Sequence, residues 1–275
     1  MHGLPCSYNS NVSQTPAIIT LTTDFGYKDP FISEMKGVIL SINPYAAIVD
    51  ITHDIEPFNI LEAGFVIGSS HRYFPSGTIH VVVVDPGVGS TRLPLIIETS
   101  GHMFVGPDNG VFSCILQETR LAECVEISND KYVIRKESPT FQGRDVFAPA
   151  AAWLSRGVRI SEFGPKLTAT KTIGITRPQV TESELTGEVL YIDRFGNAIT
   201  NITEKDLAPI GRDYRLGIKG YSVSPITHYA QAASGGLSCL VNSSGYLEIF
   251  SYLDNAARLF EIMKGDVVTV SNRRD

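Results

Sequence analysis

Residues 78–89 read TIHVVVVDPGVG, and this stretch decides the fold class. Its first seven residues form a mostly apolar run of strand length, which ends at Asp85, Pro86 and Gly87. A strand without alternating polar and apolar residues is typical of a parallel sheet that is buried on both faces. The stretch therefore predicts a central strand of an α/β domain, with a loop at its carboxyl end.

Strands and helices alternate along the chain around this stretch. Runs rich in β-branched and apolar residues predict further strands in Ile18–Gly26, Ala47–Ile51, Leu95–Glu98 and Met103–Val105. Apolar residues at helical spacing predict helices at Phe31–Ser41, Asn59–Ser69 and Val146–Arg156. This order predicts an N-terminal α/β domain with a Rossmann-like parallel sheet covered by helices.

The composition changes after Gly164, where the chain becomes polar, rich in threonine and interrupted by proline, as in a linker. A helix is predicted at Leu253–Glu261, and short strands are predicted at Gly187–Ile192, Tyr214–Ile218, Leu237–Val241, Tyr246–Phe250 and Val267–Val270. We therefore predict a flexible tail at residues 1–16, the α/β domain at 17–175, a linker at 176–186 and a smaller C-terminal β-barrel domain at 187–275.

The composition of the 275 residues excludes several classes of protein. Hydrophobic residues make up 43%, too many for a disordered chain. The net charge of −6 argues against broad contact with nucleic acid or an anionic membrane. No apolar run reaches the ~18 residues of a membrane helix, and residues 1–17 lack the features of a secretory signal. The four cysteines have no metal-ligand spacing, which predicts reduced thiols, no metal and a cytoplasmic location.

Acidic, loop-forming residues follow three successive predicted strands. Asp24, Asp54 after His53, and Asp85 stand where ligands bind in open parallel sheets, although a single such aspartate is usually a turn or helix cap. Neither of the glycine-rich phosphate-binding fingerprints occurs, so the pattern does not support a nucleotide bound through its phosphates. Arg92, seven residues after Asp85, either reaches back to that aspartate or pairs locally on the surface.

Two further polar segments are open to a structural or a functional interpretation. In TFQGRD (residues 140–145), Arg144 and Asp145 form either a structural ion pair or part of a site. In IDRFGN (residues 192–197), Asp193 and Asn197 belong either to an ordinary β-hairpin turn or to a binding loop.

These segments, taken together and in this order, resemble the S-adenosylmethionine (SAM) hydroxide adenosyltransferases, which are relatives of the bacterial fluorinase and chlorinase. The motifs that carry the resemblance are TTDFG (22–26), MKGVI (35–39), NP (43–44), DITH (50–53), FPSGTIHVVVVDPGVG (74–89), PDNG (107–110), TFQGRD (140–145) and IDRFGN (192–197). The resemblance covers the chain from Ile18 to its C-terminus. It implies a homotrimer whose active sites lie between the N-terminal domain of one subunit and the C-terminal domain of the next.

The resemblance also implies a reaction, the hydrolysis of SAM to adenosine and L-methionine by attack of water or hydroxide at the ribose C5′. The sulfonium leaves as a neutral thioether, so no acid is needed to protonate it. An aligned and desolvated oxygen nucleophile is needed instead. No metal or cofactor is implied, and SAM itself is the small-molecule partner.

The family motifs assign substrate-binding roles to seven residues. Asp24 resembles the carboxylate that accepts the ribose hydroxyls, and Phe58 resembles an aromatic wall beside the ligand. Asp193 resembles the partner of the methionine ammonium, with Ser243 near the methionine carboxylate. The adenine is assigned to Phe195, Asn197 and Asn255, the last of these at a spacing that differs from the halogenases.

Three residues are implied for the nucleophile. Asp85 and Arg92 match the family pattern, but Gln142 stands where the hydroxide-type enzymes have a histidine. A glutamine can hydrogen-bond a water molecule but cannot take its proton, and an arginine stays protonated. Asp85 is therefore the expected proton acceptor, and a slow reaction is expected.

Other functions compete with this interpretation. A non-catalytic protein that binds SAM or adenosine is favoured by Gln142. A SAM-dependent halogenase is disfavoured by Asp85, because a carboxylate ~4 Å from a halide costs about 4 kcal/mol at an effective dielectric constant near 20. The nucleophile elbow GxSxG of the α/β hydrolases does not occur.

Overall fold

The computed structural model describes residues 16–134, 140–174, 176–181, 184–211 and 213–272. The chain divides into two compact units after Ile173. Apart from Pro16, the predicted tail lies outside the described residues. The predicted linker, residues 176–186, contains strand β7 and the start of β8, so regular structure in the second unit begins before residue 187.

The first unit contains a six-stranded sheet of order β2-β1-β3-β5-β4-β6. Its strands are β1 (Ile18–Thr23), β2 (Ala47–Thr52), β3 (Ile79–Val83), β4 (Pro94–Thr99), β5 (Met103–Pro107) and β6 (Leu121–Glu126). The predicted α/β fold is confirmed, and β1, β2, β3 and β5 are parallel. The sheet is mixed rather than purely parallel, because β4 runs antiparallel to β5 and β6. A connection of three residues between β4 and β5 permits only a hairpin.

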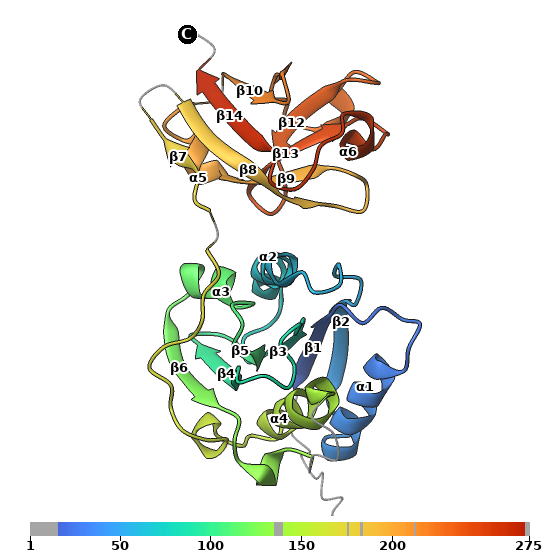
Figure 1. Ribbon diagram of the computed structural model, residues 1–275, viewed down its shortest axis with the longest axis vertical. Coiled ribbons are helices and arrows are strands. Elements are labelled where there is room, and N and C mark those ends of the chain that lie inside the picture. The colour runs from blue at the N-terminus through green and yellow to red at the C-terminus, as the bar shows by residue number, and fades with distance from the viewer. Residues whose placement is uncertain (1–15, 135–139, 175, 182–183, 212, 273–275) are drawn as a thin grey trace, which may run out of the picture. The chain divides into compact units, whose positions relative to one another are not determined.

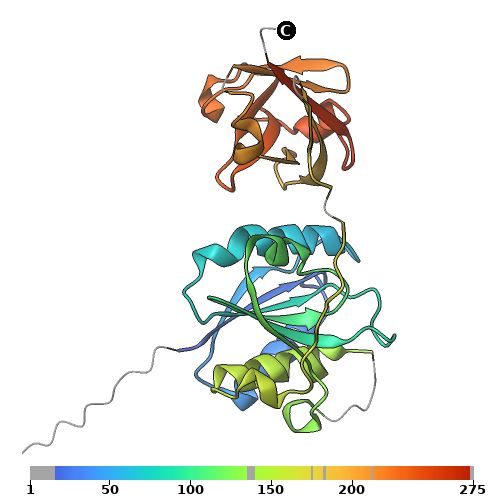
Figure 2. The same cartoon turned by 90° about the vertical axis from the view of Figure 1, so that its left-hand side faces the viewer.

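Helices cover both faces of this sheet, as Figures 1 and 2 show. One face carries α1 (Phe31–Ile42) and α4 (Ala148–Ser155), and the other carries α2 (Ile60–Ser70) and α3 (Ser113–Glu118). Every residue of β3 is buried, as its unbroken apolar sequence predicts. The two resulting cores hold the ends of the parallel strands in fixed positions.

The strand order places a crevice where polar loops meet. The chain passes from β1 to β2 on one side and then to β3 on the other side of β1. Ligands bind at such a reversal, beyond the carboxyl ends of the strands. The last pair in the β1–β3 register is Thr23 with Val83, so Asp24 lies one residue and Asp85 two residues beyond neighbouring strand ends.

The second unit is an eight-stranded, nearly closed antiparallel barrel of order β11-β10-β14-β8-β9-β13-β12, with β7 also paired to β8. Its strands are β7 (Gln179–Val180), β8 (Glu184–Ile192), β9 (Ala198–Thr203), β10 (Tyr214–Ile218), β11 (Tyr221–Val223), β12 (Leu237–Val241), β13 (Tyr246–Ser251) and β14 (Val267–Asn272). Two short helices complete it, α5 (Glu204–Leu207) and α6 (Ala256–Leu259). The predicted barrel is confirmed (Figure 1).

None of the helices in the described part of the chain combines the length and the apolar character that a membrane crossing requires.

Three of the six histidines meet in the first unit. His80 on β3 is fully buried, its Nδ1 lies 2.8 Å from Thr20 Oγ1, and its ring centroid lies 5.1 Å from that of His102. His71 is also buried, and its ring centroid lies 5.5 Å from that of His102. Desolvation, with the charges of His102 and His71, lowers the pKa of His80 to about 3. His80 is therefore neutral in the folded protein at neutral pH.

This burial predicts loss of stability in mild acid. Between pH 6.5 and about 3 the unfolded chain holds a proton on His80 that the folded chain does not, so acid favours unfolding. The free energy of unfolding is expected to fall by about 1.4 kcal/mol for each pH unit below 6.5 from this residue alone. Urea titrations followed through Trp153, the single tryptophan, measure it within the first unit. His80→Asn should reduce the dependence of the unfolding free energy on pH. His228→Asn changes an exposed histidine and should leave this dependence unchanged. The same pH dependence in the wild type and both variants would contradict the prediction.

Candidate active site

A cavity of about 450 Å³ lies in the first unit at the strand ends that carry Asp24 and Asp85. Four of the residues predicted for the site line it together, namely Asp24, Phe58, Asp85 and Gln142. The remaining lining comes from the same loops and strand ends: Phe25, Phe31, Pro57, Val83, Val88, Thr140, Phe141 and Gly143. Segments around residues 24, 58, 85 and 142 therefore converge on one space.

Asp24 and Phe58 are joined by a hydrogen bond. The backbone N–H of Phe58 donates to Asp24 Oδ2 at 2.9 Å. Phe58 has a left-handed backbone conformation (φ 69°), which is uncommon for a bulky residue and costs of order 1–3 kcal/mol. Its side chain is 70% exposed, so the conformation is not forced by burial of the ring. Asn59 then begins α2 by accepting a hydrogen bond from the Glu62 N–H. The strain presents an aromatic ring at the rim of the cavity.

A polar chain, buried at Thr23 and His53, supports the end of β1 behind Asp24. His53 Nδ1 lies 2.8 Å from Thr23 Oγ1, and His53 Nε2 lies 3.1 Å from Asp50 Oδ1. The other oxygen of Asp50, Oδ2, accepts a hydrogen bond from Lys36 Nζ at 2.6 Å. Desolvation lowers the pKa of His53 and is only partly opposed by Asp50. Burial acts to raise the pKa of Asp50, but the hydrogen bonds and charges of Lys36 and His53 outweigh it, so the pKa of Asp50 lies below its usual value. His53 does not line the cavity, so its contacts with Thr23 and Asp50 support the end of β1 from behind.

Asp85 and Arg92 form a buried, two-point ion pair. Arg92 Nε donates to Asp85 Oδ1 at 2.9 Å, and Nη2 donates to Oδ2. The two side chains are 5% and 4% exposed, so the contact is largely screened from water. Of the two alternatives that the sequence leaves open for Arg92, the structure shows the one in which it reaches back to Asp85. Arg92 is not among the lining residues of the cavity, so it acts on the cavity through Asp85.

Gln142 supplies an amide at the opposite loop. Its side-chain oxygen is buried and has no hydrogen-bond partner among the described residues, which is also true of Arg92 Nη1. Buried polar groups are normally satisfied, so the Gln142 oxygen, whose residue lines the cavity, marks a place where a ligand completes the hydrogen bonds. Gln142 directly precedes a π-helical turn at Gly143–Phe147, a feature that is frequent at functional sites.

Aromatic side chains form the apolar wall of the cavity. The rings of Phe25, Phe31 and Phe141 pack edge to face, with centroids 5.1 to 5.8 Å apart. Gly143 lies so close to this group that a Cβ there would come within 2.9 Å of the Phe141 ring. Sequence reasoning missed these phenylalanines, although Phe25 and Phe141 directly adjoin Asp24 and Gln142.

Arg144 and Asp145 form an ion pair at 2.6 Å that is not part of the cavity lining. Arg144 also pairs with Glu34 on α1 at 2.9 Å and lies over the Phe141 ring at 5.2 Å. The structural interpretation of this pair is therefore favoured.

In the second unit, the predicted binding residues 193–197 form a tight turn between β8 and β9. Asp193 Oδ1 accepts hydrogen bonds from the backbone N–H groups of Phe195 (2.8 Å) and Asn197 (2.9 Å). Asp193 Oδ2 accepts from Asn197 Nδ2 at 3.0 Å. Asp193 thus keeps acceptor capacity for one further donor. Phe195 is 75% exposed, so its ring is presented at the tip of the hairpin.

Asn255 lies against the same turn. A Cβ at Gly196 would meet the Asn255 side chain at 2.1 Å, so only glycine permits this approach. Asn255 Oδ1 accepts from the Arg258 N–H and caps α6, and the Ala257 N–H donates to the Gly196 carbonyl. The predicted adenine residues Phe195, Asn197 and Asn255 therefore belong to one local cluster.

Ser243 is exposed in the turn between β12 and β13, where Asn242 accepts hydrogen bonds from the N–H groups of Ser244 and Tyr246.

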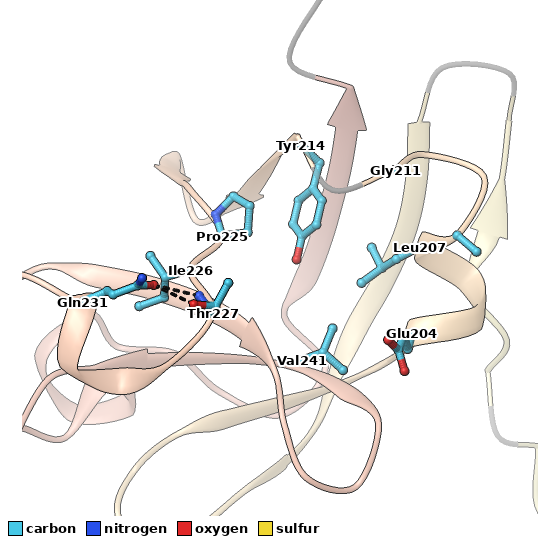
Figure 3. Close-up of a pocket in the computed structure, with 10 residues that line it drawn as sticks. Glu204, Leu207, Gly211, Tyr214, Pro225, Ile226, Thr227, Gln231 and Val241 are labelled. Atoms are coloured by element: carbon cyan, nitrogen blue, oxygen red, sulfur yellow. Dashed lines mark hydrogen bonds between the residues drawn. The ribbon is translucent and has the colours of Figure 1, made fainter.

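The second unit also contains a cavity of about 690 Å³, drawn in Figure 3. It lies among Leu207, Tyr214, Ile226 and Val241, beside the hydrogen-bonded pair Thr227 and Gln231. None of the residues predicted for the site lines it, so its larger volume does not make it the candidate site.

No group of three or more histidine, cysteine, aspartate or glutamate side chains within the described ranges is arranged to hold a metal ion.

Comparison with known proteins identifies the chain's relatives. The family described as SAM hydroxide adenosyltransferase N-terminal domain matches residues 19–164, and its C-terminal counterpart matches residues 187–269. A Methanocaldococcus jannaschii protein named (R)-S-adenosyl-L-methionine hydrolase is 37% identical, over 89% of this chain and 92% of the relative.

More distant relatives and a solved structure agree with this match. A fluorinase from Actinopolyspora mzabensis is 27% identical, over 94% of this chain and 98% of its own. The crystal structure of an uncharacterized conserved protein from Thermotoga maritima matches with a TM-score of 0.88 at 34% identity, covering 92% of this chain and 99% of that one. The chain therefore belongs to the SAM hydroxide adenosyltransferase family.

Proposed function

We infer that this chain hydrolyses SAM to adenosine and L-methionine. The observation that carries the inference is the cavity in which Asp85, buried and held by Arg92, meets Asp24, Phe58 and Gln142. Four relatives at 31–37% identity bear the name of a SAM hydrolase, which supports the same reaction for this chain.

Asp85 is the proposed proton acceptor for the attacking water. The water oxygen forms a bond to the ribose C5′, the C5′–S bond breaks, and its electron pair stays on sulfur as a neutral thioether. The proton released by the water passes to the Asp85 carboxylate and then to solvent. Gln142 Oε1 accepts the second water hydrogen, which orients the nucleophile. Arg92 holds the carboxylate in place through two hydrogen bonds and keeps its own proton.

The rest of the cavity suits a sulfonium nucleoside. Asp24 has lone pairs for both ribose hydroxyls, and Phe25, Phe31 and Phe141 exclude bulk water from the reacting carbon. Asp85 disfavours a halide as nucleophile because both are anions. We propose Asp193 and Ser243 for the methionine end of the substrate, and Phe195, Asn197 and Asn255 for the adenine, from their match to the family motifs.

We propose in addition that the substrate is the (R) sulfonium diastereomer. A sulfonium with three different substituents and a lone pair is a stereocentre, and the hydrolase relatives carry (R) in their names. In-line attack requires the sulfur to be held in one orientation, so a shaped site distinguishes the two forms.

The test is incubation of the pure protein with each SAM diastereomer, with and without chloride, followed by chromatography of the nucleosides and methionine. Equal amounts of adenosine and methionine, formed faster from the (R) form, are expected in both conditions. A chlorinated nucleoside would assign the chain to the halogenases. Saturable binding of both diastereomers without product would instead support the non-catalytic SAM-binding protein that Gln142 favours.

We also propose that the protein forms a homotrimer with its sites at the subunit interfaces. We propose further that it is cytoplasmic and that its reaction needs no cofactor or metal. The family resemblance supports the trimer. The free thiols of Cys114, Cys124 and Cys239 support a reducing compartment.

A further inference from the structure

The side chain of Asn242 helps to shape the turn that carries Ser243. Asn242 Oδ1 accepts hydrogen bonds from the N–H groups of Ser244 (2.9 Å) and Tyr246 (3.1 Å). Both bonds require the amide to face in one direction, with its nitrogen pointing away from the turn. The orientation of this amide therefore decides the shape of the turn.

Glu248 fixes that orientation. Asn242 Nδ2 donates to Glu248 Oε2 at 3.1 Å, and an acceptor at this place excludes the flipped amide. The other carboxylate oxygen, Oε1, accepts from the Tyr229 hydroxyl at 2.8 Å. Both oxygens of Glu248 are thus committed to side chains that hold the loops around residues 229 and 242.

Glu248 is only 4% exposed, and a buried carboxylate is expensive for a fold. Desolvation raises the pKa of Glu248, and the charge of Asp193 raises it further, against the hydrogen bonds from Tyr229 and Asn242. Packing an apolar side chain at such a position is often neutral or stabilising. The stability of the barrel therefore does not by itself explain a glutamate here.

The network also lies beside the carboxylate proposed for the ammonium group. The charge of Asp193 acts on both Glu248 and Tyr229, so these groups share one electrostatic environment. Asn242, which leads directly into Ser243, is the third member of the network. The network thus leads through Asn242 to Ser243, and the charge of Asp193 acts on two of its members.

We propose that Glu248 is a positioning residue for the amino-acid end of the substrate, acting through Asn242 on the Ser243 turn and beside Asp193. The proposal rests on the proposed function, and Glu248 itself need not touch the substrate. Its effect is expected at the methionine part, because the hydrogen bonds of the Glu248 carboxylate go to Tyr229 and Asn242 and lead to the Ser243 turn, whereas Phe195 and Asn197 are held by Asp193.

Glu248→Gln tests the proposal, since glutamine has nearly the same shape but only one acceptor oxygen for two donors. The KM for SAM and the inhibition constant of L-methionine are expected to rise about tenfold, the equivalent of one hydrogen bond to a charged group. The kcat and the inhibition constant of adenosine are expected to stay within about twofold of the wild-type values. A purely structural role would weaken adenosine and SAM alike.

The test uses two control variants and, in case Glu248→Gln does not fold, an alternative variant in the same network. Glu184→Gln changes an exposed glutamate of the same unit, and Tyr221→Phe changes a tyrosine as exposed as Tyr229 (47% against 45%); neither should alter any constant. If Glu248→Gln does not fold by circular dichroism, Tyr229→Phe removes one hydrogen bond of the network and should raise the KM about threefold. Unchanged constants in a folded variant, or equal losses for adenosine and methionine, would overturn the proposal.

Failure of the proposed function is recognised separately. If the wild-type protein forms no product, calorimetric titration with SAM, adenosine and L-methionine still compares the two ends of the ligand. Weaker binding of SAM and methionine by Glu248→Gln, with unchanged binding of adenosine, would then support the positioning role in a binding protein.

Discussion

Asp85→Asn is expected to lower kcat for SAM hydrolysis by about 10²–10⁴-fold, the range that general bases contribute. An asparagine can still orient a water molecule but cannot take its proton, and Gln142 offers no substitute. The measurement is the rate of adenosine formation at saturating SAM. Asp54→Asn is the matched control, because Asp54 follows β2 at the same edge of the sheet, is exposed and does not line the cavity.

The same substitution leaves Arg92 buried without its anionic partner. Loss of one member of a buried ion pair costs about 3–5 kcal/mol, so Trp153 fluorescence must show that the variant is folded at the assay temperature. A folded Asp85→Asn protein that retains kcat within tenfold of the wild type would rule out Asp85 as the base.

Asp24→Ala is expected to raise the KM for SAM by about 10²–10³-fold, since two hydrogen bonds from the ribose to a charged group are lost. Comparison of adenosine with 2′-deoxyadenosine as inhibitors isolates this contact. The wild type should prefer adenosine by about tenfold, and the variant should bind both equally. Asp54→Ala, the exposed control at the same sheet edge, should keep the preference. A variant that still distinguishes the two nucleosides would show that another group reads the 2′-hydroxyl.

Much of the fold could be predicted from the sequence because its strands are apolar and its helices periodic. Strand direction could not, since an apolar run such as Leu95–Glu98 reads the same in either orientation, and only the short turn after β4 makes it antiparallel. Strand β9 was missed because Thr200 and Asn201 are buried in it and satisfied by the carbonyl groups of Leu247 and Thr176.

The helix predicted at Leu253–Glu261 was too long, and backbone conformation gives the reason. Leu253 and Glu261 both adopt positive φ (57° and 53°), which an α-helix does not allow. Asn255 caps the helix instead, so α6 spans only Ala256–Leu259.

The candidate site was predictable where polar residues follow strands, as at Asp24 and Asp85. Its supporting contacts were not, because they join residues far apart in the chain, such as Lys36 with Asp50 and Glu34 with Arg144. No local pattern reports such pairs. The aromatic wall was missed for a related reason, since a phenylalanine beside a polar motif reads equally well as core.

The bond between the Phe58 N–H and Asp24 has a consequence for observing the protein at work. A ribose that binds Asp24 adds two donors to a carboxylate that already accepts from the Phe58 N–H, so the protection of this amide proton is expected to change when the site fills. Its rate of exchange with deuterated solvent then records occupancy at a single backbone position, without any label on the ligand. Because the backbone at Phe58 is strained, the same exchange rate also reports how readily this loop opens.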